Sequence, residues 1–140
     1  MSLLVSNQMF PIDLKYIEVP LKNNLTGIMV IKSEEAEKKH EGRVKELHTQ
    51  WIQPPWKDNN EIIRQAQIWE AFKGERETDF YLYRSLVLEK FLKAWDILDD
   101  AGKPVPCDKA NIAKLAIPIA NELIDQFINK NVPKEADLKN

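Results

Sequence analysis

The stretch from Phe80 to Ile128 constrains the fold most, because it carries large apolar side chains in long helical patterns and no catalytic motif. From about Glu75 to Leu98, apolar residues occupy most of the circumference of a helix that turns about 100° per residue. Such a helix has to be covered on nearly every side, so we expect it to be the central helix of the core. Arg84 projects into its apolar half, where an unpaired guanidinium would be costly. We expect that side chain to meet a carboxylate, a carbonyl or a partner.

Caps and apolar periodicity predict four other helices. They are expected at about 34–51 after the N-cap Ser33, from Asp58 to Lys73-Gly74, at 109–115 after the N-cap Asp108, and from Pro118 onwards. Before them, residues 10–32 collect β-branched and aromatic residues around a Lys22-Asn23-Asn24 turn and predict a β-hairpin. The apolar alternation changes face between Tyr16 and Ile17, so we expect a bulge or bend there.

Together these patterns predict a mainly α (α+β) fold: a small helical domain of four to five helices with an N-terminal β-hairpin. A chain of 140 residues is sufficient for one domain over 1–140. Within it we expect a flexible N-terminus at 1–9, the hairpin at 10–32, a helical body at 33–130 and a disordered tail at 131–140.

Composition excludes several classes of function. The formal net charge is −2 with both signs interspersed, which gives no global attraction to nucleic acid or to anionic lipid. The longest apolar runs are far too short to span a bilayer. The single cysteine, Cys107, cannot form an internal disulfide, which suits a reducing compartment. We therefore expect a cytoplasmic protein that binds neither nucleic acid nor membrane.

No pattern in the chain points to catalysis. The four glycines are too dispersed to form a phosphate-binding loop. His40 and His48 would lie about two turns apart on one helix, too far to chelate a metal ion without a third ligand. Asp99-Asp100 stands in a turn, where such residues satisfy backbone donors more often than they share a proton. No histidine lies near Cys107 in the sequence to activate it. We expect no enzyme, no metal and no cofactor.

The second half of the chain combines four features in a fixed order. They are a helix that ends near Trp95, the turn Asp99-Asp100-Ala101-Gly102-Lys103-Pro104-Val105-Pro106, a capped short helix at Asp108–Asn111, and a last helix with Leu123–Phe127. This order resembles the closing segment of phage tail assembly chaperones, small helical proteins that keep the tape measure protein soluble while a siphophage-type tail is built. The N-terminal half agrees only in the order of its elements, from a strand entry at Val19–Leu21 onwards.

The resemblance implies a non-enzymatic chaperone that binds the tape measure protein, helps to recruit tail tube subunits and forms a homo-oligomer. It implies a place in the bacterial host cytoplasm and absence from the mature virion. The candidate partner-binding residues are Trp51, Trp56, Trp69, Tyr81, Leu82, Arg84 and Leu86. Each tryptophan is also compatible with a place in the core, which is favoured for Trp69.

Two other functions remain open at this point. One is a structural virion component, such as a head–tail adaptor or a tail completion protein, that stays in the particle. The other is a small helical adaptor domain unrelated to phage. Mature particles would contain an adaptor and lack a chaperone.

Overall fold

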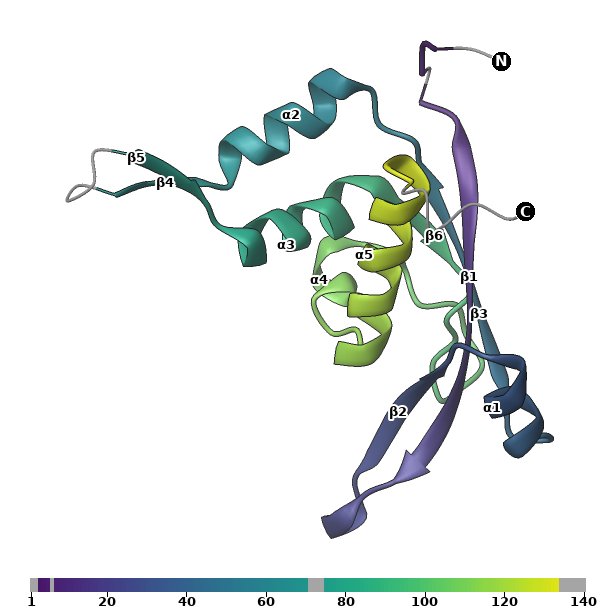
Figure 1. Cartoon of the computed structure of the whole chain (residues 1–140). Coiled ribbons are helices and arrows are strands. Elements are labelled where there is room, and N and C mark those ends of the chain that lie inside the picture. Colours follow the sequence, from purple (N-terminus) through teal and green to yellow (C-terminus); the bar gives the residue numbers. More distant parts are fainter. Residues whose placement is uncertain (1–2, 6, 71–74, 134–140) are drawn as a thin grey trace.

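The computed structural model describes residues 3–5, 7–70 and 75–133, and its fold is mixed α+β (Figure 1). Four antiparallel strands form the main sheet in the order β2-β1-β3-β6, and the remaining two strands, β4 and β5, form a separate hairpin. The strands are β1 (Met9–Pro20), β2 (Thr26–Ile31), β3 (Lys45–Ile52), β4 (Gln67–Glu70), β5 (Glu75–Thr78) and β6 (Leu92–Trp95). The helices are α1 (Glu34–Lys39), α2 (Trp56–Gln65), α3 (Phe80–Phe91), α4 (Lys109–Ile112) and α5 (Ile117–Asn131). The expected mainly α, all-helical body is therefore wrong.

The predicted helix at 34–51 is wrong beyond its first turns. Ser33 does cap α1, because the Ala36 amide donates to its hydroxyl at 3.1 Å. The helix ends at Lys39, and Gly42 follows with a positive φ of 83°, a conformation that glycine adopts without strain. Residues 45–52 then form β3, whose side chains alternate between a buried and an exposed face.

The predicted central helix at 75–98 is also shorter than expected. Its first residues form β5, and Asp79 then caps α3 by accepting hydrogen bonds from the amides of Tyr81 and Leu82, both at 3.1 Å. After Phe91 the chain leaves the helix and becomes β6, which pairs with β3. Pairing with β3 therefore overrides the helical preference of the last residues of this segment.

Two further boundaries differ from the sequence expectation. α2 begins at Trp56 after Pro55, so Asp58 lies in its first turn instead of capping it, and α2 ends at Gln65. The end expected at Lys73-Gly74 lies outside the described residues. The caps near the C-terminus are confirmed, because Asp108 accepts from the Asn111 amide at 2.9 Å and Pro118 stands in the first turn of α5. The disordered tail was expected to begin at residue 131, but Asn131 is the last residue of α5. Residues 134–140 lie outside the described part of the chain.

The hairpin of β1 and β2 has a regular register through the position where a bulge was expected. Lys15 pairs with Ile31 and the pairing continues without a shift to Pro20 and Thr26, so no bulge is present between Tyr16 and Ile17. The change of face has a different cause, since both faces of the sheet are covered here. Lys15 and the buried Ile17 share one face, and the Lys15 ammonium lies 2.8 Å from the carboxylate of Glu37 in α1.

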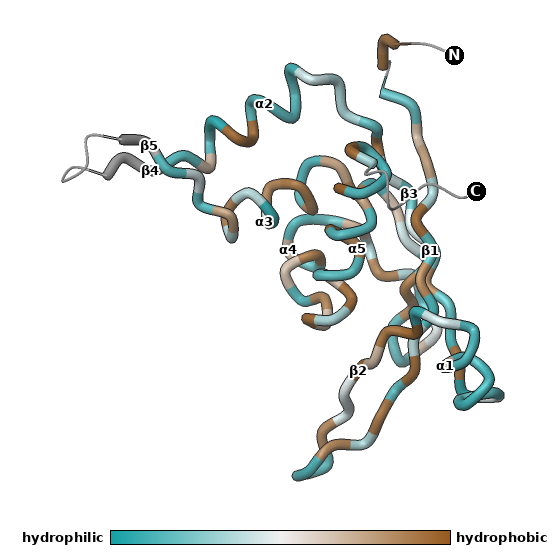
Figure 2. The backbone as a smooth tube through the Cα atoms, viewed as in Figure 1, coloured by the Kyte–Doolittle hydropathy of each residue, from teal (hydrophilic) through white to brown (hydrophobic). Residues whose placement is uncertain are grey.

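The main core lies between the other face of the sheet and helices α3, α4 and α5 (Figures 1 and 2). At its centre Trp51 is completely buried, and its ring stacks on Phe127 with centroids 4.8 Å apart. The Trp51 indole N–H donates to the Thr49 hydroxyl at 2.8 Å, which itself donates to the Ile12 carbonyl at 2.6 Å. The one buried polar side chain among the described residues is therefore satisfied.

His48, on the exposed face of β3, should make stability depend on pH. Its hydrogen bond with Asp13, at 3.0 Å, and the nearby carboxylates of Asp96 and Glu46 raise its pKa above the usual 6.5. Because the folded state binds this proton more tightly, the stabilisation is fully present below pH 6.5 and is lost as the pH rises through the raised pKa. Urea unfolding of the wild type and of His48→Gln at pH 6 and pH 8.5 measures it. The advantage of the wild type should be larger at pH 6, and an equal advantage at both pH values would contradict this.

Candidate functional site

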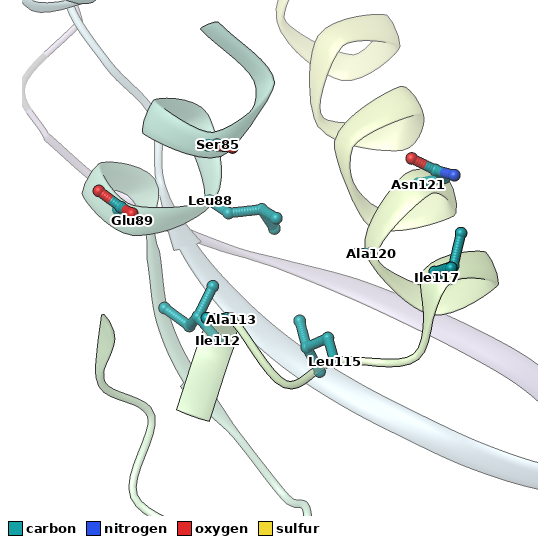
Figure 3. Close-up of a pocket in the computed structure, with 9 residues that line it drawn as sticks. All are labelled: Ser85, Leu88, Glu89, Ile112, Ala113, Leu115, Ile117, Ala120 and Asn121. Carbon is teal, nitrogen blue, oxygen red and sulfur yellow. The ribbon is translucent and has the colours of Figure 1, made fainter. Parts of the chain in front are cut away.

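An apolar groove lies between α3, α4 and the first turns of α5 (Figure 3). Its volume is about 260 Å³, and its lining residues are Ser85, Leu88, Glu89, Ile112, Ala113, Leu115, Ile117, Ala120 and Asn121. We call this feature the α3–α5 groove. Ile117 stands on its rim and is 77% exposed, which is unusual for a large aliphatic side chain beside a pocket. The groove is therefore an open apolar surface between helices.

The exposed apolar surface continues onto the first turn of α3. Tyr81 is 88% exposed and Leu82 is 40% exposed. These residues precede Ser85 by four and three positions, so they lie on the same face of the helix as the groove wall. Two of the candidate partner-binding residues from the sequence, Tyr81 and Leu82, therefore adjoin the α3–α5 groove.

Arg84 joins the two helices that form the groove. Its guanidinium contacts the Asp125 carboxylate at 3.0 Å and also donates to the side-chain and backbone oxygens of Asn121 at 3.3 and 3.4 Å. The expectation that Arg84 meets a carboxylate or a carbonyl is confirmed. Because the Arg84 side chain is 30% exposed, solvent screens this pair and its contribution to stability is small. The pair links α3 to α5 across the side of the groove.

Two other candidates, Trp51 and Leu86, do not reach this surface, and the side chain of a third, Trp69, is not described. Trp51 is in the centre of the core, and Leu86 is half-buried and packs against the same core. Trp69 lies in β4, but its side chain is outside the described part of the structure. Neither Trp51 nor Leu86 offers a free apolar face to a partner.

Trp56 lines a different groove, at the other end of the α2–α3 pair. It is 79% exposed at the start of α2 and lies beside Tyr83 and the end of α5 in a groove of about 240 Å³. The Tyr83 hydroxyl donates to Asn59 at 3.1 Å, and burial raises the pKa of Tyr83. Since α2 and α3 run in opposite directions (Figure 1), Trp56 and Tyr81 lie at opposite ends of the pair and do not form one patch.

Sequence reasoning missed several exposed apolar positions. Phe80 lies on the first turn of α3 with Tyr81, and Leu21 and Leu25 lie at the tip of the β1–β2 hairpin. Ile117 was missed as well. A signal for Ile117 exists in the sequence: it stands directly before Pro118 and outside the inward stripe formed by Ile119 and Leu123.

The titratable residues show no catalytic arrangement within the described part of the chain. Both ring nitrogens of His48 lie near carboxylates, Nδ1 at 3.0 Å from Asp13 and Nε2 at 3.3 Å from Glu46. Burial and the neighbouring Asp108 raise the pKa of Cys107, so its thiol is held in the less reactive, protonated form. No group of three or more potential metal ligands is found among the described residues. Asp99 accepts from the amides of Ala101 and Lys103, both at 2.9 Å, and so stabilises the turn.

The chain matches no known family, no curated protein and no solved structure. None of the helices in the described residues is both long and apolar enough to cross a membrane.

Proposed function

We propose that this protein is a non-enzymatic phage tail assembly chaperone, which binds the tape measure protein in the bacterial host cytoplasm and helps to recruit tail tube subunits. The observation that carries the proposal is the α3–α5 groove with its exposed apolar rim, formed by Ile117, Tyr81 and Leu82. The sequence after β6 supports it, because the turn at Asp99–Pro106 followed by α4 and α5 resembles the closing segment of these chaperones, although the helix before the turn ends at Phe91 and not near Trp95.

The mechanism requires no chemical step. A tape measure protein is a long helical chain with apolar stripes, and a groove between helices accepts such a stripe by burying it. Each contact of this size is weak, but several copies of the chaperone along one chain would add their affinities through multivalent binding. Because the chaperone binds only the unassembled partner, it shifts that partner away from aggregation.

Co-expression tests this proposal. The tape measure protein encoded in the same gene cluster should remain in the soluble fraction when this chain is present and should aggregate without it. It should also co-purify with the chain. A tape measure protein that is equally insoluble in both cultures, or purified chain that turns over a small substrate, would contradict the proposal.

A structural virion component is the second candidate, and the β1–β2 hairpin favours it. This hairpin projects beyond the helices (Figure 1), and its tip carries the exposed Leu21 and Leu25. A ring subunit uses such arms to contact its neighbours. Mass spectrometry of purified mature tails separates the two functions, since a ring subunit is present in stoichiometric amounts and a chaperone is absent.

A further inference from the structure

We propose that the outer edge of β2 pairs with the same edge of a second copy of this chain, so that two main sheets join into one continuous antiparallel sheet. The proposal is independent of the α3–α5 groove and of the chaperone function. Its basis is the hydrogen-bonding phase, the charge pattern and the surroundings of β2.

In the β1–β2 hairpin, hydrogen-bonded pairs of residues alternate with pairs that are not hydrogen-bonded. This alternation, the phase of the hairpin, shows which backbone amides and carbonyls of β2 face away from β1. The Leu21 amide donates to the Leu25 carbonyl at 2.7 Å, so these two residues form a hydrogen-bonded pair. Such pairs alternate along antiparallel strands, which places Gly27, Met29 and Ile31 in bonds with β1. Thr26 then lies opposite Pro20 in a pair without hydrogen bonds, which agrees with the missing amide hydrogen of proline.

The same phase turns the backbone groups of Thr26, Ile28 and Val30 outward. Among the described residues, no backbone or side-chain hydrogen bond reaches these amides and carbonyls. A row of three such donors and acceptors at a sheet edge is a template for another strand. A strand that pairs there would satisfy all three residues.

The other edges of the main sheet are protected, and β2 is not. β6 has only four residues, includes Lys93 and pairs with β3 through an irregular register. The part of β1 that extends beyond β3 carries Pro20 and the Glu18–Lys45 ion pair, and the part that extends beyond β2 carries Pro11 and Asp13. Proline, charge and irregularity are the usual means of blocking edge pairing. By contrast, residues 23–31 contain no charged residue and no proline.

The hydrogen-bonding pattern of this edge is self-complementary, which makes a second copy a suitable occupant. A two-fold axis at Ile28 places Ile28 of each copy opposite its equivalent, and Thr26 opposite Val30 of the other copy, so that all outward groups pair. Because residues 23–31 carry no charge, two copies meet along this segment without repulsion between like charges.

A groove lies between β2 and α5. Its volume is about 300 Å³, and it is lined by Ile28, Met29 and Val30 of β2 and by the first half of α5. The opposite wall is held in place, because Lys32 at the end of β2 lies 3.0 Å from Glu122 of α5. The edge is thus accessible while α5 covers the inner face.

Sedimentation velocity and amide hydrogen exchange on the full chain test the proposal. The chain should form a dimer as its concentration rises, and the amides of Thr26, Ile28 and Val30 should gain protection together with it. The amides of Gly27, Met29 and Ile31 should be protected at every concentration. Chain that stays monomeric, or a dimer without protection of the three outward amides, would overturn the proposal.

A matched pair of variants tests the role of charge at this edge. Met29 is 40% exposed and lies opposite Ile17, on the face of the sheet away from the main core, so Met29→Lys and Met29→Gln should both fold, as thermal melts would verify. Met29→Lys brings two ammonium groups together near the axis and should weaken the dimer roughly tenfold relative to Met29→Gln. Equal dimer affinities would show that the dimer forms through another surface, and protection that arises only when a tape measure segment is added would assign the edge to that partner. Either result rejects the proposal.

Discussion

Replacing Trp51 with alanine should lower the free energy of unfolding by about 3–5 kcal/mol, the range typical of removing a buried aromatic ring. Trp51 is completely buried and stacks on Phe127, which also stacks on Phe91 at 5.4 Å. Its removal leaves a cavity where β3 meets α5, and neither the sheet nor the helix can collapse to fill it. Guanidinium unfolding followed by circular dichroism measures the change.

Two control variants separate packing from hydrogen bonding. Trp51→Phe keeps a stacked ring and should cost less than half as much as alanine. Thr49→Val leaves the Trp51 ring in place but removes the acceptor of its indole N–H, which should cost about 1–3 kcal/mol for an unsatisfied buried donor. If the free energy of unfolding of Trp51→Ala is less than about 1 kcal/mol below that of the wild type, Trp51 does not have the central place in the core described above.

Residues 45–52 explain why the fold class was mispredicted. Leu47 and Trp51 are four positions apart and fit a helical stripe, but together with Thr49 they also fit a strand. The helical interpretation omitted Thr49 because it is polar. In the structure Thr49 is buried, and its hydroxyl is satisfied by hydrogen bonds with the Ile12 carbonyl and the Trp51 indole N–H. The bond to Ile12 depends on the pairing of β3 with β1, two strands that are far apart in the sequence.

Local features were predicted more accurately than tertiary ones. Ser33, Asp108 and Pro118 begin their helices as expected, since a cap depends only on residues within one turn. The end of α3 at Phe91 was missed, because it is set by pairing of the next four residues with β3. Sequence reasoning cannot detect that pairing without knowing that β3 is a strand.

The residues of the candidate site show the same difference between local pattern and tertiary packing. Tyr81 and Leu82 were identified because they share one face of a single helix, which periodicity reveals. Ile117 was not, because its place on the groove depends on how α5 packs against α3 and α4. Arg84 was recognised as needing a partner, but only the fold shows that Asp125 of α5 is that partner.

The double substitution Leu82→Asp with Ile117→Asp should abolish the solubilisation of the tape measure protein while the fold is retained. Burial of one large aliphatic side chain contributes about 1.5–3 kcal/mol, so losing two should weaken binding roughly a hundredfold or more. The fold should tolerate both changes. Leu82 is 40% exposed, and an aspartate at 117 would lie in the first turn of α5, where negative charge interacts favourably with the helix dipole.

Two comparison variants make this result specific to the groove. Leu98→Asp changes an exposed leucine in the turn after β6, away from the α3–α5 groove, and should leave co-purification with the tape measure protein unchanged. Leu86→Asp alters a half-buried residue that packs on the core, and it should lower the melting temperature as well as binding. If the double variant folds and still keeps its partner soluble, the α3–α5 groove is not the binding surface, and the groove beside Trp56 becomes the surface to test.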